Sequence, residues 1–589
     1  MIDLVESFNN AFRLQQEGRL VEAETLYRAV LDVAPEHPGS HHLLGLVEHQ
    51  LGRHEPALQS IRRAIELNDS EPNYHNNLGT VYRTLGKIEE AIACYRHAVG
   101  LKPDFAAALN NLGSTLLQRG EFAQAQRALE RALEAKPDYA GAWFNLGNVL
   151  AARDEHAKAV EHYRRALAID PNHVDALNNL GAALSALDEC NEAALCYQHV
   201  LTLQPANAAA HNNFGRVLAQ RDELDAAIAH FKEAIALQPH AIDAHINLGN
   251  VLLEKGEAVA AHESYERALA LDPAHESAHW NDGLALLVQG DLAEGFRRWR
   301  WNVAASKRFA VPEWRGEALN GATILIHAEQ GFGDAIHFAR YVPMVAARGG
   351  RVIFEAPVEL HRVFATLDGV DQVVAFGDPL PDFAWHCPLL SLPVVFGTTL
   401  RDVPDSVPYL SADPEAVADW SRRVAGPALK VGLVWAGRPE HKRDRYRSLP
   451  LAELAPLAAV PNVAFYALQK GAAIGEAEHA PEGMRLEILS PLLSDFADTA
   501  AAIMALDLVI SVDTSVAHLA GALGKPVWIL HAHAPDWRWL EKRSDSPWYP
   551  TAELLRQDAS RRWTTVVDDV AAELRALTTS DQVRMNRIA

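Results

Sequence analysis

The chain has 589 residues, of which 49% are apolar, and a formal net charge of −22 at pH 7. Such an acidic balance argues against a general nucleic-acid-binding protein, which needs a basic face. No uninterrupted apolar run approaches the roughly 18 residues of a membrane span, and residues 1–6 lack the basic and apolar regions of a signal peptide. The four cysteines have no Cys-x-x-Cys spacing and suit a reducing compartment. We therefore expect a cytoplasmic protein with no membrane span and no nucleic-acid partner.

A 34-residue period runs through the first half of the chain. In most units a glycine follows an asparagine by two positions, and an Ala-x3-Tyr/Phe-x2-Ala pattern comes later in the unit. Proline keeps the same interval and predicts where the second helix of each unit ends. These features are the signature of tetratricopeptide repeats, which are helix pairs that stack into a solenoid. We expect residues 1–305 to form an α-solenoid of about eight repeats, with a divergent cap near residues 279–301.

The recurring asparagines form a ladder, one in the first helix of each unit: Asn77, Asn111, Asn145, Asn179, Asn213, Asn247 and Asn281. An amide side chain donates to a peptide carbonyl and accepts from a peptide N–H, so a ladder in register could hold an extended backbone. Asparagine before Leu-Gly is also common in ordinary repeats, where it would stabilise the array itself. We favour peptide binding and predict that the ladder holds a protein partner.

From about residue 308 the repeats give way to short β-rich runs that alternate with helical stretches. The runs lie at residues 323–327, 351–355, 372–376, 430–435, 463–467, 508–512 and 527–530. This alternation predicts an α/β fold with parallel sheets, and a proline-rich stretch at 403–427 separates two sets of strands. We expect two Rossmann-like domains, 306–410 and 411–577, then a tail at 578–589. Ligands of such sheets bind beyond the carboxyl ends of the strands.

The first candidate loop is Gly331-Phe-Gly333-Asp334, directly after the first strand. The glycines let the backbone approach a ligand, and a helix starts here with unpaired N–H groups. Local sequence leaves two interpretations of Asp334: an N-cap carboxylate or a functional group in the cleft.

The second candidate loop, residues 435–450, carries five cations in an otherwise acidic protein: Arg438, Lys442, Arg443, Arg445 and Arg447. Arginine matches phosphate with a planar fork of donors. A solvated basic loop is the alternative, but a position at the end of a strand favours a diphosphate site. Gln469 and Lys470 follow another strand and are predicted nucleotide contacts.

The third candidate loop is Asp513-Thr514-Ser515, at the start of a helix, where hydroxyls and free amides can hold phosphate oxygens. His518 lies four residues after Thr514 and projects from the same side of that helix. The segments 536–539 and 548–550 either line the cleft and stack on a base or sugar, or pack between the domains. His531 and His533 lack further ligands nearby and there is no Asp-x-Asp, so no metal is expected.

The segment Asp513–Pro526 resembles the nucleotide-sugar motif of bacterial heptosyltransferase-type glycosyltransferases (family 9), which have the GT-B fold of two facing Rossmann domains. Gly331–Asp334 resembles the glycine-aspartate loop of that family. Arg447 stands where the family has a lysine, a departure that keeps the charge. The layout of repeats before a transferase also resembles the protein O-GlcNAc transferases and the repeat–glycosyltransferase fusions that modify flagellin.

These resemblances imply a metal-independent glycosyltransferase that needs no cofactor beyond its nucleotide-sugar donor. Asp334 would be the catalytic base, and Arg447 and Lys442 would hold the diphosphate. The other donor-binding residues would be Gly331, Gly333, Gln469, Lys470, Asp513, Thr514, Ser515 and His518. The repeat groove would hold a protein acceptor, with flagellin as the candidate from layout alone. Two alternatives stay open: a cell-surface saccharide acceptor with a docking role for the repeats, and a repeat scaffold with an inactive transferase domain.

Overall fold

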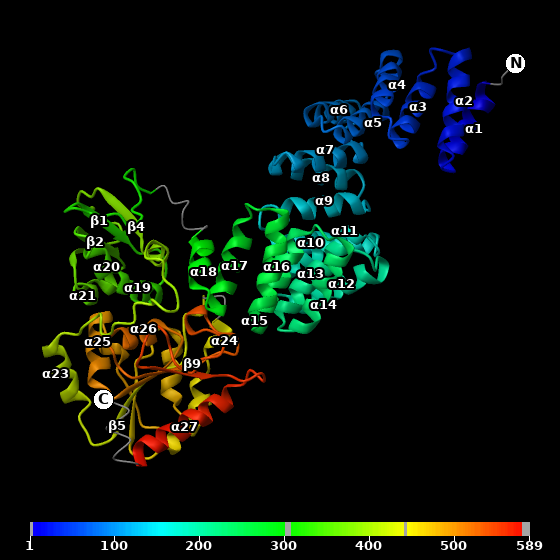
Figure 1. The fold of residues 1–589 in the computed structure, drawn as a ribbon. Helices are drawn as coiled ribbons and strands as arrows, with labels where there is room; N and C mark the ends of the chain where they lie inside the picture. Colours follow the sequence, from blue (N-terminus) through cyan, green and yellow to red (C-terminus); the bar gives the residue numbers. More distant parts are fainter. Residues whose placement is uncertain (1–3, 301–307, 441–443, 580–589) are drawn as a thin grey trace. The chain divides into compact units, whose positions relative to one another are not determined.

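The structure is a computed structural model that describes residues 4–300, 308–440 and 444–579 (Figure 1). The chain divides into two compact units, Met1–Pro239 and His240–Ala589. The expected domain boundary at 305/306, the predicted site residue Lys442 and positions 580–589 of the expected tail lie outside the described residues. None of the described helices is both long and apolar enough to cross a membrane.

The described part of the first unit consists of antiparallel helix pairs, as the period predicts. The helices are α1 (Leu4–Gln16), α2 (Leu20–Val33), α3 (Pro38–Gln50), α4 (His54–Leu67), α5 (Pro72–Thr84), α6 (Ile88–Leu101), α7 (Ala106–Gln118), α8 (Phe122–Ala135), α9 (Ala140–Ala151), α10 (His156–Ile169), α11 (Val174–Ala186), α12 (Cys190–Leu203), α13 (Ala208–Gln220) and α14 (Leu224–Leu237). Pro137 and Pro171 each stand two residues beyond the end of a second helix, so the predicted helix ends are confirmed.

The repeat glycines have a packing role that explains their spacing. In the repeat formed by α9 and α10, a Cβ added to Gly147 would lie 2.5 Å from Cε1 of Tyr163. The ring of Tyr163 is fully buried in the space that the glycine leaves, and its hydroxyl donates to Asn148 Oδ1 at 2.8 Å. The same contact recurs between Gly181 and Tyr197 in the next repeat. Glycine therefore lets the two helices of a repeat approach closely around a ring.

The second unit begins with two more helix pairs: α15 (Ile242–Lys255), α16 (Ala258–Leu271), α17 (Glu276–Gln289) and α18 (Leu292–Trp299). The last helix has 8 residues where the earlier second helices have 14. Gly256 and Gly290 end α15 and α17 in the left-handed conformation, with φ of 88° and 92°.

Two parallel sheets follow in the same unit. The first has the order β3-β2-β1-β4 and the second the order β10-β9-β8-β5-β6-β7. The strands are β1 (Thr323–His327), β2 (Arg351–Ala356), β3 (Val370–Ala375), β4 (Trp385–Pro388), β5 (Leu429–Val434), β6 (Val463–Ala467), β7 (Leu486–Ile488), β8 (Leu508–Val512), β9 (Val527–His531) and β10 (Ala552–Arg556). All the predicted strands are found within two residues of their expected bounds, and the expected α/β character with parallel sheets is confirmed.

Helices surround and connect these strands. They are α19 (Phe332–Phe338), α20 (Val342–Ala346), α21 (His361–Phe364), α22 (Leu392–Val395), α23 (Pro414–Arg423), α24 (Asp444–Arg447), α25 (Phe496–Ala505), α26 (Ser515–Ala522) and α27 (Trp563–Thr579). Of the short 3-10 turns, η8 (Trp537–Trp539) matters most for the site because it lies in the segment that follows the carboxyl end of β9.

The strand orders fix where a ligand would bind. In the second sheet β5 lies between β6 and β8. The chain runs from β5 to β6 and β7 on one side and then crosses to β8 on the other side. The loops after β5 and β8 therefore lie side by side. In the first sheet β1 lies between β2 and β4 and has the same central place. Crevices at such reversals of strand order are the usual ligand sites of parallel α/β sheets.

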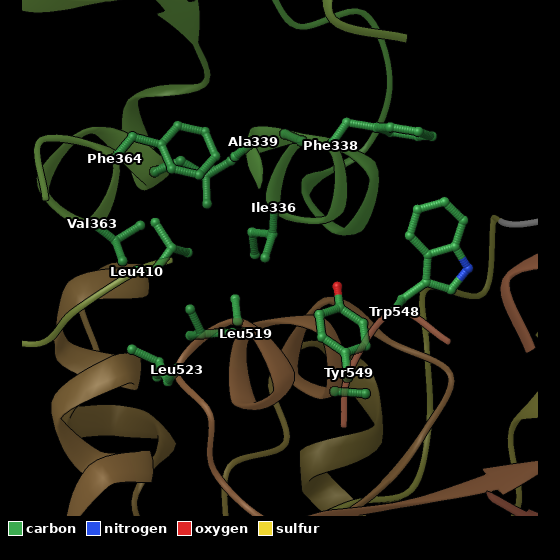
Figure 2. Packing of buried hydrophobic residues seen from close by; sticks show 14 of the residues in the cluster. Ile336, Phe338, Ala339, Val363, Phe364, Leu410, Leu519, Leu523, Trp548 and Tyr549 are labelled. Carbon is green, nitrogen blue, oxygen red and sulfur yellow. The ribbon is translucent and has the colours of Figure 1, made fainter. Parts of the chain in front are cut away.

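The two sheets share one apolar core, in which α19 packs directly on α26 (Figure 2). Ile336 of α19 faces Leu519 of α26 and the ring of Tyr549 in Figure 2. Arg340 is buried here, and no carboxylate among the described residues pairs with it. It donates to the carbonyl oxygen of Trp548 at 2.7 Å and lies 4.6 Å from the ring centre of Tyr549. The packing therefore holds the loops after β1 and β8 against each other.

Candidate functional site

A cavity of about 1160 Å³ opens at the carboxyl ends of both sheets. Loops after β1, β5, β6, β8 and β9 line it, together with residues of α17 and α18. Every described residue that the sequence predicts for catalysis or donor binding lies in its wall: Gly331, Gly333, Asp334, Arg447, Gln469, Lys470, Asp513, Thr514, Ser515 and His518. The structure thus brings together four loops that are far apart in the chain.

Asp334 stands in the first turn of α19, while Gly331 is the N-cap residue. The Oδ1 atom of Asp334 accepts a hydrogen bond from Nη2 of Arg538. Burial raises the pKa of Asp334 because the charged carboxylate loses water, and the charge of Arg538 acts in the opposite direction. The carboxylate is therefore a half-buried group at the cavity wall, paired with Arg538.

Arg538 is the centre of an acidic cluster that the sequence did not reveal. It is only 7% exposed, donates to Asp334, and donates through Nη1 to Asp536 Oδ1 at 2.7 Å. Burial lowers the pKa of Arg538, but the neighbouring aspartates outweigh burial and raise it overall. The sequence predicts that residues 536–539 either stack on a base or sugar in the cleft or pack between the domains, and neither alternative includes an ion pair. No local signal announces an ion pair between residues 204 positions apart.

Asp513 and His518 form the opposite side of this cluster. Burial, aided by Asp536, raises the pKa of Asp513 to about 6. His518 Nε2 lies 3.8 Å from Asp513 Oδ1, and its Nδ1 lies 3.1 Å from the hydroxyl of Tyr549. The imidazole stacks on Trp539 with ring centres 5.3 Å apart. Burial, aided by the charge of Arg538, holds the pKa of His518 well below its usual range, so this ring is neutral.

The first turn of α26 also faces the cavity. Thr514 is its N-cap residue, and the first helical hydrogen bonds run from the amides of Ala517 and His518 to Thr514 O. The amides before them are those that a helix start offers to an anion. The hydroxyls of Thr514 and Ser511 lie 2.9 Å apart. Thr514 and Ser515 therefore occupy the place that a phosphate-binding role requires.

Arg447 joins the loop after β5 to the loop after β8. Its Nη1 donates to the backbone oxygen of Asp513 at 3.0 Å, and its Nε donates to Asp444 Oδ1 at 3.1 Å. The guanidinium covers Gly437, where an added Cβ would lie 2.5 Å from Arg447 Nη2. Arg447 is therefore already oriented along the cavity wall.

Gln469 and Lys470, both predicted nucleotide contacts, brace the cavity wall in this structure. Gln469 Oε1 accepts from the amides of Trp435 and Ala436 at 3.0 and 2.9 Å. Its Nε2 donates to the carbonyl oxygens of Ala436 and Lys470. Lys470 Nζ donates to Leu493 O at 2.6 Å. Their side chains thus fix the ends of β5 and β6, and nucleotide contact stays a prediction for both.

The asparagine ladder links successive repeats. Asn111, Asn145 and Asn179 each donate through Nδ2 to an asparagine of the preceding repeat, at 3.0, 2.8 and 2.8 Å. Asn281 makes the same bond to Asn250 at 2.9 Å, and Asn77 Nδ2 lies 2.8 Å from His42 Nε2. Asn213 and Asn247 hold the equivalent positions on α13 and α15. An amide has a second N–H and a carbonyl, so bracing and peptide binding are compatible.

One cluster among the described residues has ligand atoms close enough for a metal ion: His262, Glu266 and Asp282. It lies in the repeats of the second unit and does not line the cavity. Arg298 donates to Asp282 Oδ2, while His262 Nδ1 lies 2.6 Å from Asp282 Oδ1. The guanidinium therefore already supplies the positive charge that a cation would bring.

Comparisons with known proteins identify the repeats. Tetratricopeptide repeat models match residues 12–72, 111–174, 246–299 and 162–194, and a TPR repeat model matches 79–120 and 215–256. Protein FlbA of Caulobacter vibrioides is 29% identical over 299 residues, which cover 46% of this chain and 50% of that protein. The chain thus spans about half the length of this curated relative. It carries tetratricopeptide repeats between residues 12 and 299.

Three solved structures are similar to part of this chain, each with a TM-score below 0.5. A chain of the APC/C Cut9–Hcn1 hetero-tetramer is 19% identical, with coverage of 45% of this chain and 52% of that one and a TM-score of 0.39. YrrB, a TPR protein with an unusual peptide-binding site, is 24% identical, with coverage of 31% and 95% and a TM-score of 0.28. Pseudomonas aeruginosa pilF is 26% identical, with coverage of 34% and 93% and a TM-score of 0.31.

Proposed function

We propose that the chain is a metal-independent glycosyltransferase of the GT-B type that transfers a sugar from a nucleotide-sugar to a protein held by the repeats. The observation that carries this proposal is the meeting of Asp334, Arg447 and the first turn of α26 in one cavity. They come from three loops, each at a strand end where parallel α/β sheets bind ligands. The resemblance of these loops to heptosyltransferase-type enzymes supports the same assignment.

In this proposal each group has a step in sugar transfer. Asp334 takes the proton of the acceptor hydroxyl as its oxygen attacks the anomeric carbon of the donor. The bond between that carbon and the diphosphate oxygen breaks, and the diphosphate leaves with the electron pair. Arg538 favours the ionised form of Asp334, which a base needs, against the effect of burial.

Cationic and hydrogen-bonding groups oppose the charge of the leaving diphosphate. Arg447 supplies a fork of donors beside the amides of α26, and Lys442 is proposed to add a second cation. Asp513 and the neutral His518 are suited to sugar hydroxyls, which both donate and accept hydrogen bonds. Because side chains carry the positive charge, turnover is expected to survive a chelator such as EDTA.

The acceptor is proposed to be a protein, with flagellin as the candidate from the layout of repeats before a transferase. The asparagine ladder leaves amide and carbonyl groups that can hold an extended backbone. A saccharide acceptor and an inactive scaffold are the alternatives. The convergence of Asp334, Arg447, Asp513 and His518 in one cavity weighs against a scaffold.

The deciding experiment screens UDP, GDP, ADP, CDP and CMP against the full chain by thermal shift, with EDTA present. A bound nucleotide raises the melting temperature according to its occupancy. The matching nucleotide-sugar is then supplied with a co-expressed candidate acceptor, and intact mass is measured. A sugar-sized mass gain on the protein supports the proposal, and labelling of saccharide alone favours the saccharide alternative. No stabilisation by any nucleotide would overturn the proposal.

A further inference from the structure

Two neighbouring residues of α24 make contacts in different parts of the second unit. Arg447 donates to the backbone of Asp513 in the loop after β8. Tyr446 donates its hydroxyl to Glu254, which lies 192 residues earlier in the last turn of the repeat helix α15. Tyr446 and Arg447 both line the cavity, whereas Glu254 does not. A single turn of helix therefore connects a repeat to the proposed diphosphate site.

Glu254 is held in place from two sides. Its carboxylate accepts from Tyr446 and lies 3.8 Å from Nη2 of Arg445. Its backbone oxygen accepts from Arg561 Nη2 at 3.0 Å. A negative charge at a helix C-terminus opposes the helix dipole. The charge of Glu254 therefore does not stabilise its own helix. The carboxylate is instead stabilised by its contacts to Tyr446 and Arg445.

The turn that carries Arg447 needs external support. With 4 residues, α24 is far below the length at which a helix is stable alone. Within the loop it is braced by Asp444, which accepts from Arg447, and by the bond from the Ser448 amide to Asp444 O. Beyond the loop, the contacts of this turn include those to Asp513 and Glu254. Loss of the Glu254 contact would remove one of the supports that orient the turn.

We infer that Glu254 is a positioning residue for the donor. Through Tyr446 it holds α24 in the orientation that places Arg447 at the diphosphate, so the repeats take part in donor binding as well as acceptor binding. The apparent affinity for a diphosphate falls with the fraction of molecules whose site is correctly oriented. This inference rests on the proposed function of the cavity as a nucleotide-sugar site.

The test measures binding of inorganic pyrophosphate, UDP, GDP, ADP and CDP to the full chain by calorimetry. Glu254→Ala and Tyr446→Phe are each expected to weaken diphosphate binding by about 2- to 12-fold, the equivalent of one hydrogen bond. The double variant is expected to be no weaker than either single one, because both remove the same contact. Glu254→Gln keeps an oxygen acceptor for the Tyr446 hydroxyl and is expected to bind nearly as the wild type.

Glu257→Ala is the matched control, because Glu257 lies three residues further on and pairs with Lys255 at 2.8 Å. It is expected to leave diphosphate affinity unchanged. Unchanged affinity in Glu254→Ala, alongside clear loss in Arg447→Ala, would overturn the coupling and keep the donor site. A lowered melting temperature without a change in affinity would give Glu254 a purely structural role and also overturn the coupling. Failure of the wild type to bind any of these probes would overturn both the coupling and the proposed function.

Discussion

Gly333 in the first turn of α19 lies so close to His518 of α26 that a Cβ on the glycine would be 3.1 Å from the imidazole Cδ2. The imidazole has little room to move, because it stacks on Trp539 and is hydrogen-bonded to the Tyr549 hydroxyl. The two loops thus meet at a contact where a Cβ would be closer than in ordinary packing. The close packing of α19 on His518 therefore explains why position 333, the second glycine of Gly331-Phe-Gly333-Asp334, is a glycine.

The variant Gly333→Ala is therefore expected to displace His518 and to weaken donor binding. Overpacking of this kind costs about 1–3 kcal/mol of folding stability. Gly331→Ala is the matched control, because its added Cβ would lie 3.8 Å from Asp334 Oδ2 and its φ of −68° suits any residue. Melting temperature and nucleotide affinity are measured for both. Equal effects of the two variants would contradict the steric explanation.

The ion pair between Asp334 and Arg538 predicts a shift in the pH dependence of transfer. Arg538 lowers the pKa of Asp334 against the effect of burial, so Arg538→Met is expected to raise that pKa. A base with a higher pKa becomes ionised only at higher pH, so the acidic limb of kcat/KM should move upward. Arg538→Lys keeps the charge and should shift the acidic limb of the kcat/KM profile less. If Arg538→Met leaves that limb at the wild-type pH, Asp334 is not the titrating base.

Asp334→Asn tests the same residue directly. It is expected to abolish sugar transfer and to leave nucleotide affinity nearly intact, because it removes the base and keeps the size of the side chain. Transfer is followed by the mass of the acceptor and binding by calorimetry. A loss of affinity as large as the loss of turnover would instead give Asp334 a structural role at the start of α19.

The sequence predicts the elements of this fold better than it predicts their cross-links. A fixed period and long apolar runs locate the repeats and the first strands, because burial imposes these patterns on local sequence. Strands β4, β7 and β10 were missed. The strand β7 has 3 residues, β4 ends in proline and β10 carries charge at two of five positions. Arg538 and Glu254 were missed because their partners lie 204 and 192 residues away.

The ladder has a control that separates bracing from peptide binding. Asn145 donates to Asn110 of the preceding repeat, so Asn145→Ala and Asn110→Ala remove the same hydrogen bond. Each is expected to cost about 0.5–1.5 kcal/mol of repeat stability. If the ladder also binds the acceptor, Asn145→Ala should reduce acceptor modification more than Asn110→Ala does, and adding Asn179→Ala and Asn213→Ala should reduce it further. Equal acceptor defects in Asn145→Ala and Asn110→Ala would support bracing alone.

Buried histidines predict that the first unit loses stability in mild acid. Burial lowers the pKa of His42 to about 4, although Glu71 acts in the opposite direction. As the pH falls, the unfolded chain protonates His42 before the folded chain does. The contribution of His42 to the free energy of unfolding is therefore complete above about pH 6.5 and is lost as the pH falls toward 4. This contribution is about 3 kcal/mol. Urea unfolding of the full chain from pH 7 to 4 measures it, and His42→Gln should flatten the curve.

The last repeats belong to the same compact unit as the two sheets, which predicts where the chain can be cut. Trp280, Leu284 and Trp299 of α17 and α18 line the cavity. Phe296 of α18 packs on Trp537 with ring centres 5.3 Å apart.

Residues 240–589 are therefore expected to fold alone and to bind nucleotide as the full chain does. Residues 306–589 lack the last two repeats and are expected to aggregate or to melt at a lower temperature, because Trp537 loses its cover. Gel filtration, thermal melting and nucleotide calorimetry compare the two fragments. Full affinity and an unchanged melting temperature in residues 306–589 would show that the repeats are not needed for the donor site, and the link between Glu254 and Tyr446 would then have no role in donor binding.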